Sequence, residues 1–172
     1  MWQLQLEQVL MVPTGEAPHK IISDDPGRDV RLAMTRLALA EDDRFAVSAV
    51  EVEREGPSYT YETLEELAEQ NGDRALVLVM GADAAVGLES WKEPRRVVDR
   101  ARLAIARRAG TDDAEVAAVL RSLGADDASM LEMPHFGISS STARERAAAG
   151  MPLRYIVPDQ VARFINERRI YR

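Results

Sequence analysis

The residues best suited to chemistry stand in one run, ISSSTARER at residues 138–146. Three serines and a threonine follow one another where an apolar segment ends and a helix is predicted to begin. The free N–H groups and the dipole of a helix N-terminus favour an anion. Hydroxyls add neutral donors, and a guanidinium group matches the geometry of phosphate. We interpret the run as a phosphate-binding segment; the alternative is a capping box, because Glu145 follows Thr142 by three residues.

Composition narrows the classes of protein that can carry such a run. The chain has 172 residues, 46% of them hydrophobic, which predicts a single globular domain over residues 1–172. A net charge of −7 argues against a general binder of nucleic acids or membrane surfaces. Because there is no cysteine and there are only two histidines, we expect no disulfide and no metal site. No apolar stretch approaches the roughly 20 residues that span a bilayer, and no signal-peptide pattern opens the chain, so we expect a cytoplasmic protein.

Apolar runs alternate with helical patterns along the whole chain. Strands are predicted at residues 9–12, 45–50, 75–80, 102–106 and 129–133, and helices at about 29–40, 60–71, 112–123, 140–149 and from 158 onward. The final helix is expected to bury Val161, Phe164 and Ile165, and the run at 75–80 to be buried on both faces of a sheet. This alternation indicates an α/β fold with a parallel sheet.

Ligands of such sheets bind beyond the carboxyl ends of the strands. Three polar loops follow predicted strands or precede a predicted helix there, at residues 14–20, 81–83 and 139–144. Because they are expected at the same edge, we treat them as one candidate site.

Several of these residues have two readings. His19 and Lys20 are suited to phosphate, but two exposed loop residues are the plainer interpretation. Asp83 is suited to accept a hydrogen bond from a ribose hydroxyl, or it caps a helix after a strand-to-helix turn. Trp91 is suited to stack on a flat ring, although a lone tryptophan is more often part of a core. Neither a P-loop nor a Gly-x-Ser-x-Gly elbow occurs in the chain.

Taken in order, these segments resemble a known family. The matching residues are VPTGEAPHK at 12–20, RLAM at 31–34, REGPSYT at 54–60, GAD at 81–83 with Trp91, ISSS at 138–141 with Arg144, YIVP at 155–158, and Ile170-Tyr171. The chain resembles the bacterial nicotinate-nucleotide adenylyltransferases of the nucleotidyltransferase superfamily. The resemblance covers nearly the whole chain, and it is the ordered set rather than any one segment that is specific.

The resemblance implies a Rossmann-like sheet with helices on both faces, and a reaction in NAD biosynthesis. The family moves AMP from ATP, which carries Mg²⁺, onto nicotinate mononucleotide, giving nicotinate adenine dinucleotide and pyrophosphate. By matching position, ATP is expected at Gly81, Asp83, Ile138, Ser139, Ser140, Ser141 and Arg144, and nicotinate mononucleotide at Thr14, His19, Lys20, Tyr59, Thr60 and Trp91. Arg144 and Lys20 are expected to serve catalysis, which needs positioning and charge neutralisation rather than a protein nucleophile.

One part of the family pattern is not found here. The family opens with a strand, a loop similar to Gly-Gly-Thr-Phe-Asp-Pro and a His-x-Gly-His motif, whereas residues 1–8 are expected to be the tail of that first helix. Because the missing strand would be central and the histidines would contact ATP, we expect either a start further upstream or a chain that folds poorly alone and turns over little.

Two other functions remain open at this point. One is a non-catalytic nucleotide-binding module, which would bind nucleotide without releasing pyrophosphate. The other is an adenylyltransferase for a different phosphorylated acceptor such as phosphopantetheine, although the 56–60 segment and Trp91 favour a nicotinate ring. The sequence carries no signal for oligomeric state, so a homo-oligomer stays an alternative.

Overall fold

A computed structural model describes residues 2–18, 24–72, 74–107, 112–134 and 137–172. Its contacts divide the chain into two compact units. The first unit comprises Met1–Ser58 and Gly137–Arg172, and the second comprises Tyr59–Phe136. Each unit contains a parallel sheet and its own buried cluster, so each is described by itself.

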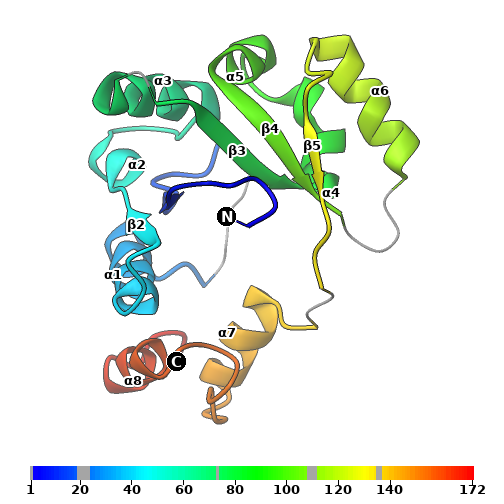
Figure 1. Cartoon of the computed structure of the whole chain (residues 1–172). Helices are drawn as coiled ribbons and strands as arrows, with labels where there is room; N and C mark the ends of the chain where they lie inside the picture. Colours follow the sequence, from blue (N-terminus) through cyan, green and yellow to red (C-terminus); the bar gives the residue numbers. More distant parts are fainter. Residues whose placement is uncertain (1, 19–23, 73, 108–111, 135–136) are drawn as a thin grey trace. The chain divides into compact units, whose positions relative to one another are not determined.

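Within its described residues, the first unit combines a small sheet with four helices (Figure 1). Strands β1 (Val9–Met11) and β2 (Phe45–Val47) pair in parallel. The helices are α1 (Arg28–Leu39), α2 (Val50–Glu53), α7 (Ser140–Ala148) and α8 (Asp159–Glu167). Helices α1 and α8 pack on each other, and the buried cluster is formed by Ala147, Leu153, Val161 and Ile165.

The second unit contains a three-stranded parallel sheet in the order β3-β4-β5. The strands are β3 (Leu76–Gly81), β4 (Ala101–Ala106) and β5 (Ser129–Leu131). The helices are α3 (Thr60–Asn71), α4 (Ala82–Val86), α5 (Pro94–Arg100) and α6 (Asp113–Leu123), with a 3₁₀ turn η1 (Leu88–Ser90). Its fully buried side chains include Leu88, Val97, Leu103, Ile105 and Val116.

Burial on both faces is found at β4 rather than at β3. Within the described residues β4 has a strand on each side, and Leu103, Ala104 and Ile105 are all buried. Strand β3 pairs only with β4 among the described strands, and 49% of Val79 is exposed. The prediction that residues 75–80 are buried on both faces is therefore wrong, because an apolar run does not reveal whether other elements cover both faces of its strand.

The predicted order of strands and helices is confirmed, with local differences. The second strand ends at Val47, and Val50 begins α2 instead of closing the strand. The fifth strand ends at Leu131, and Phe164 is only half-buried. Residues 2–5 form a turn, and residues 2–8 contain no helix, so the expected tail of a helix is not found there. Helices α4 and α5 and the turn η1 were not predicted, because they are short and lie in a stretch without clear periodicity.

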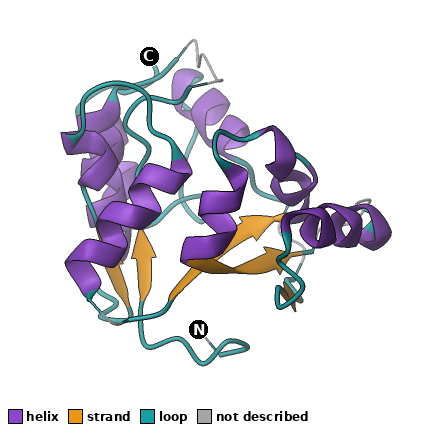
Figure 2. Ribbon diagram, turned by 90° about the horizontal axis from the view of Figure 1, so that it is seen from above, coloured by secondary structure: helices purple, strands orange, loops and turns teal. Residues whose placement is uncertain are grey.

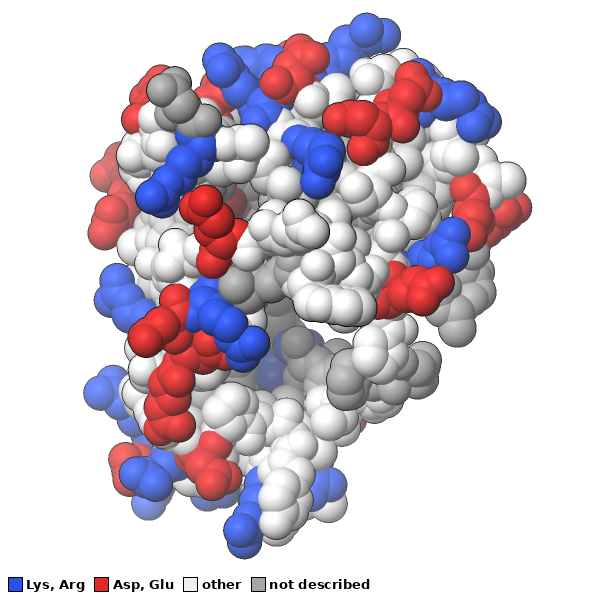
Figure 3. All heavy atoms as spheres, viewed as in Figure 1, with Lys and Arg blue, Asp and Glu red and all other residues white. Residues whose placement is uncertain are grey.

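The α/β class is confirmed, since parallel strands alternate with helices that flank the sheets (Figure 2). No helix within the described ranges is long and apolar enough to cross a membrane. On the face shown in Figure 3, basic and acidic side chains are interspersed and do not gather into one charged field.

Candidate functional site

The serine run begins helix α7, as predicted, but its cap differs from the expected one. Ser139 is the N-cap, and its Oγ accepts a hydrogen bond from the Thr142 N–H at 3.1 Å and lies 2.9 Å from Thr142 Oγ1. A capping box from Thr142 to Glu145 is therefore wrong, because Thr142 already lies inside the helix. Ser140 and Ser141 occupy the first turn and are exposed. The run thus presents hydroxyls and N–H groups at a helix N-terminus, the arrangement that favours anions.

A cavity of about 600 Å³ opens at this helix start, within the first unit. Four of the predicted residues line it, namely Ile138, Ser139, Ser140 and Arg144. The remaining walls come from the end of β1, from α1, from the 156–158 segment, from α8 and from Tyr171. We call it the anion cavity. Of the five residues of the 138–144 run that were predicted to bind ATP, four therefore line one cavity, and Ser141 is not among its lining residues.

Arg144 supplies a positive charge to the anion cavity. It is half-buried, and its Nη2 donates to Ser141 Oγ at 3.2 Å. Among the described residues, no carboxylate lies within ion-pair distance of this guanidinium group. A guanidinium group that is partly desolvated and not matched by a carboxylate is suited to bind a phosphate group in forked geometry.

The loop after β1 carries Thr14, which was predicted to contact the mononucleotide. The loop is held by Arg31 of α1, whose Nη2 donates to the carbonyl oxygens of Thr14 at 2.6 Å and of Gly15 at 2.7 Å. Gly15 is buried, and a Cβ there would overlap the carbonyl oxygen of Glu51. Only glycine fits this close approach of two backbones. His19 and Lys20, which follow in the sequence, lie outside the described residues.

Among the described lining residues of the anion cavity, two with ionisable side chains received no role from the sequence, namely Arg31 and Tyr171. Tyr171 is half-buried against the hydrophobic cluster of the first unit. Burial raises the pKa of its hydroxyl, and the nearby charge of Arg144 acts in the opposite direction. The only sequence signal for either residue was its place in the family pattern, which names a position without giving a role.

Gly81 and Asp83 lie in the second unit, where β3 passes into α4. Gly81 is the last residue of the strand and the N-cap of the helix. A Cβ on Gly81 would lie 2.5 Å from Asp83 Oδ1, so the exposed carboxylate of Asp83 lies directly beside the glycine backbone. The alternative reading of Asp83 as the N-cap is wrong, because it is the second residue of the helix. An acidic side chain at the carboxyl end of a strand is suited to accept hydrogen bonds from ribose hydroxyls.

The predicted ring-binding residues Tyr59, Thr60 and Trp91 also lie in the second unit. Tyr59 and Thr60 stand at the start of α3, and Trp91 follows the turn η1. Tyr59 and Trp91 are half-buried and both pack against the hydrophobic cluster of this unit. Lys92 Nζ lies 4.3 Å from the centroid of the Tyr59 ring. Core packing, the plainer reading of Trp91, is therefore correct, and both residues remain partly exposed.

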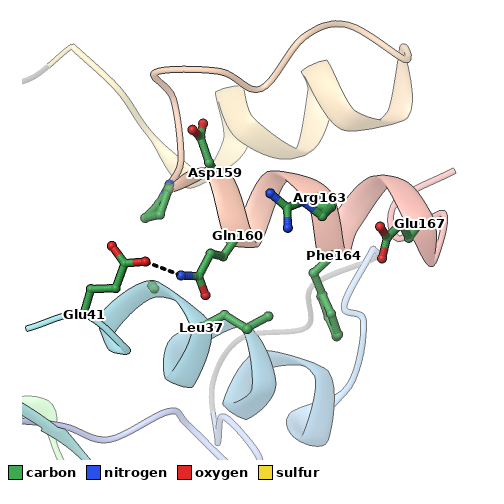
Figure 4. Close-up of a pocket in the computed structure, with 9 residues that line it drawn as sticks. Leu37, Glu41, Asp159, Gln160, Arg163, Phe164 and Glu167 are labelled. Atoms are coloured by element: carbon green, nitrogen blue, oxygen red, sulfur yellow. Dashed lines mark hydrogen bonds between the residues drawn. The ribbon is translucent and has the colours of Figure 1, made fainter.

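A second groove, also of about 600 Å³, lies between α1 and α8 of the first unit (Figure 4). Its lining residues are Leu37, Ala38, Glu41, Pro158, Asp159, Gln160, Arg163, Phe164 and Glu167. Gln160 Nε2 donates to Glu41 Oε1 at 2.6 Å across the groove, as the dashed line in Figure 4 shows. None of the predicted site residues lines this groove, which we call the acidic groove.

The sequence of this chain is similar to that of a known family of nucleotide-transferring enzymes. Residues 2–146 match the family described as cytidylyltransferase-like. A probable nicotinate-nucleotide adenylyltransferase of Synechococcus sp. (strain JA-3-3Ab) is 37% identical over 99% of this chain and 83% of its own length. One of Mycobacterium sp. (strain KMS) is 39% identical over 96% of this chain and 82% of its own length.

A solved structure shares the fold. The Plasmodium falciparum nicotinic acid mononucleotide adenylyltransferase complexed with NaAD has a TM-score of 0.73 and 16% sequence identity, and the match covers 96% of this chain and 83% of that one. The Rossmann-like class expected from the resemblance is thereby confirmed. With relatives above 35% identity over nearly its whole length, the chain belongs to the nicotinate-nucleotide adenylyltransferases of the cytidylyltransferase-like family.

Proposed function

We propose that this chain transfers AMP from ATP to nicotinate mononucleotide, giving nicotinate adenine dinucleotide and pyrophosphate in NAD biosynthesis. The observation that carries the proposal is the anion cavity, where the capped start of α7 and the guanidinium group of Arg144 meet. Family membership supports the choice of reaction, since the curated relatives bear the name of this activity.

The anion cavity is proposed to hold the phosphates of ATP. The N–H groups at the start of α7 and the hydroxyls of Ser140 and Ser141 would donate hydrogen bonds, and Arg144 would contribute the charge. Negative charge grows on the departing pyrophosphate during transfer, so fixed donors there lower the barrier without rearranging. On sequence grounds alone, we propose that Lys20 contacts the phosphate of nicotinate mononucleotide and serves catalysis there.

The second unit is proposed to recognise the nucleoside parts of the substrates. Asp83, whose carboxylate lies beside the backbone of Gly81, would accept hydrogen bonds from the adenosine ribose. The accessible parts of Tyr59 and Trp91 would contact the pyridine ring, with Thr60 at the helix start as a polar neighbour. On the first unit, Thr14 would contact the mononucleotide, with His19 near its phosphate.

The chemistry proceeds without a protein nucleophile. A phosphate oxygen of nicotinate mononucleotide forms a bond to the α-phosphorus of ATP, while the bond from that phosphorus to the bridging oxygen of the β-phosphate breaks. Pyrophosphate leaves with the electron pair. Holding the attacking and leaving oxygens in line is the main task of the protein in such a reaction.

We propose that Mg²⁺ enters as part of the ATP substrate. Among the described residues, no group of three or more acidic or histidine side chains is placed to hold a metal ion. The ion would reduce the charge of the triphosphate, and the residues of the anion cavity would bind the remaining phosphate oxygens. We place the reaction in the cytoplasm, as expected for a chain without cysteine.

Release of pyrophosphate is the direct test of this function. The purified chain with MgATP is expected to form pyrophosphate faster with nicotinate mononucleotide than with nicotinamide mononucleotide or phosphopantetheine. Faster turnover with either of the other acceptors would overturn the choice of substrate. Binding of MgATP without pyrophosphate release from any acceptor would favour the non-catalytic module.

A further inference from the structure

The anion cavity contains two arginines whose surroundings differ. Arg144 has a serine hydroxyl as its hydrogen-bond partner and no carboxylate within ion-pair distance among the described residues. Arg31 forms an ion pair with Asp25 and also donates to two backbone carbonyls. A cation can bind an incoming phosphate well only where its charge and its N–H groups are not already engaged. The two arginines therefore differ in what they can offer a ligand.

The N–H groups of Arg31 are directed at the loop after β1. Its Nη2 bridges the carbonyls of Thr14 and Gly15, at 2.6 and 2.7 Å, and its Nη1 donates to Asp25 Oδ1. The planar guanidinium group holds these partners in a fixed fork, which a lysine could not reproduce. Arg31 thus joins the first turns of α1 to the loop that carries Thr14.

Asp25 neutralises this arginine and is itself anchored. Its Oδ1 also accepts a hydrogen bond from the Gly27 N–H at 3.2 Å, just before α1 begins. The hydrogen bond from Arg31 holds the pKa of the Asp25 carboxyl below its usual value, so the pair stays charged at neutral pH. The positive charge of Arg31 is therefore offset before any substrate arrives.

The same loop is anchored on its other side. The Glu16 N–H donates to Ser58 Oγ at 3.2 Å, and the Ser58 N–H donates to the Glu16 carbonyl at 2.8 Å. Ser58 is buried, and Gly15 lies against the backbone of Glu51. Arg31 adds a charged side chain to this support, beside the hydroxyl and backbone contacts of Ser58.

We propose that Arg31 is a positioning residue, which fixes the Thr14–Gly15 backbone for the acceptor nucleotide while Arg144 is the arginine that faces phosphate. The proposal rests on the proposed function, because it assumes that Thr14 contacts nicotinate mononucleotide. It divides the work of two like residues in one cavity: one binds the anion, and the other shapes the surface on which the acceptor lies.

The substitution Asp25→Asn distinguishes a positioning role of Arg31 from direct phosphate binding, because the two roles predict opposite changes in the Kd of nicotinate mononucleotide. If Arg31 positions the loop, removing the charge of Asp25 weakens the hold on the Arg31 guanidinium group. Its hydrogen bonds to the Thr14 and Gly15 carbonyls then loosen, and the Kd of nicotinate mononucleotide rises several-fold. If Arg31 were a phosphate ligand restrained by Asp25, the same change would free its charge and lower that Kd. Asp29→Asn, at an exposed carboxylate in the first turn of α1, is the matched control.

Arg31→Lys and Arg31→Ala test whether acceptor binding needs the planar guanidinium group that donates to the Thr14 and Gly15 carbonyls. Both are expected to raise the Kd of nicotinate mononucleotide by about tenfold, the effect of losing a charge-assisted hydrogen bond, and to change the Kd of MgATP less than twofold. The slope of log Kd against log salt for MgATP is expected to stay at its wild-type value in both, and to fall in Arg144→Ala. Arg36→Ala, on the exposed side of α1, is the control.

Two results would overturn the proposal: tighter or unchanged acceptor binding in Asp25→Asn, or wild-type acceptor binding in Arg31→Lys. A wild-type chain that binds no nicotinate mononucleotide would overturn the proposed function instead. Hydrogen exchange then tests the positioning role separately. Arg31→Lys is expected to speed exchange at the Glu16 amide, whereas Arg36→Ala is not, and equal exchange in the two variants would contradict the proposal.

Discussion

The anion cavity and the acidic groove are two hollows of nearly equal size in the same unit, and they differ in charge. Each measures about 600 Å³, both use α1 and α8, and Ala38 and Pro158 line both. Among the described residues, the lining of the anion cavity has two arginines and no carboxylate. The acidic groove has three carboxylates, at Glu41, Asp159 and Glu167, against one guanidinium group (Figure 4).

The difference shows that size does not identify the nucleotide site. A polyphosphate carries several negative charges, so the carboxylates of the acidic groove would repel it, while Arg144 and the start of α7 would attract it. Both hollows touch α8, but only the anion cavity contains a helix N-terminus with hydroxyl groups around it. The predictions below test whether these features, and not the hollow itself, make the site.

Gly15→Ala is expected to have the largest effect, because it disrupts one wall of the anion cavity. The added Cβ overlaps the Glu51 carbonyl oxygen, and a backbone must move to relieve the overlap. We expect a loss of about 2 kcal/mol of unfolding free energy, measured by denaturant unfolding, with loss of acceptor binding. Gly137→Ala, in the same unit with open space around its Cα, is the control and should leave both unchanged. A stable Gly15→Ala variant would contradict the packing described for this loop.

Ser139→Ala tests the helix start that distinguishes the two hollows. Losing this cap should lower the unfolding free energy by about 1 kcal/mol. We also expect the Kd of MgATP to rise several-fold, because the first turn of α7 loses its fixed geometry. Asp112→Ala removes the cap of α6 in the second unit and should lower stability by a similar amount. If the two variants changed the Kd of MgATP equally, the cap would act through general stability alone.

The sequence predicted more of the scaffold than of the site's internal contacts. Strands and long helices were recovered because their hydrophobic periods are local, as for β4 and α6. The chemistry of a helix start predicted that the run at 138–146 suits phosphate, whereas the individual roles of Ser139 and Arg144 came from the family resemblance, and Ser139 was not predicted as the N-cap. The fork of Arg31 and the approach of Gly15 to Glu51 could not be predicted, because they join segments 16 to 36 residues apart that only the fold brings together. The short helices α4 and α5 lacked a repeating pattern to detect.

Low pH should reduce the stabilisation that the Asp25–Arg31 ion pair gives to the loop after β1, while Arg31 and Arg144 stay charged. The hydrogen bond from Arg31 holds the pKa of Asp25 below its usual value, so the pair stabilises the fold fully above the unfolded pKa of about 3.9. That contribution is lost as pH falls through the lowered folded pKa. Because 37% of the Asp25 side chain is exposed, we expect less than about 1 kcal/mol. The difference in unfolding free energy between wild type and Asp25→Asn, measured from pH 7 to pH 3, should shrink toward zero. A difference that stays constant over this range would contradict the stabilising role of the Asp25–Arg31 ion pair.

Changes in the acidic groove should have the smallest effect. Glu41→Gln removes a charge but keeps a partner for Gln160, so we expect the unfolding free energy to change by less than about 0.5 kcal/mol. The Kd of MgATP should change less than twofold. An increase in ATP affinity in this variant, measured by titration calorimetry, would show that the acidic groove competes for the nucleotide and would remove the distinction between the two hollows.

One measurement tests the central claim most directly: the Kd of MgATP for Arg144→Ala beside Arg163→Ala. Each variant removes one arginine from one hollow of the same unit, and the two hollows have similar volumes. The account predicts at least about a tenfold rise in Kd for Arg144→Ala and less than a twofold change for Arg163→Ala. Equal losses in the two variants, or a larger loss in Arg163→Ala, would contradict the assignment of the anion cavity as the ATP phosphate site.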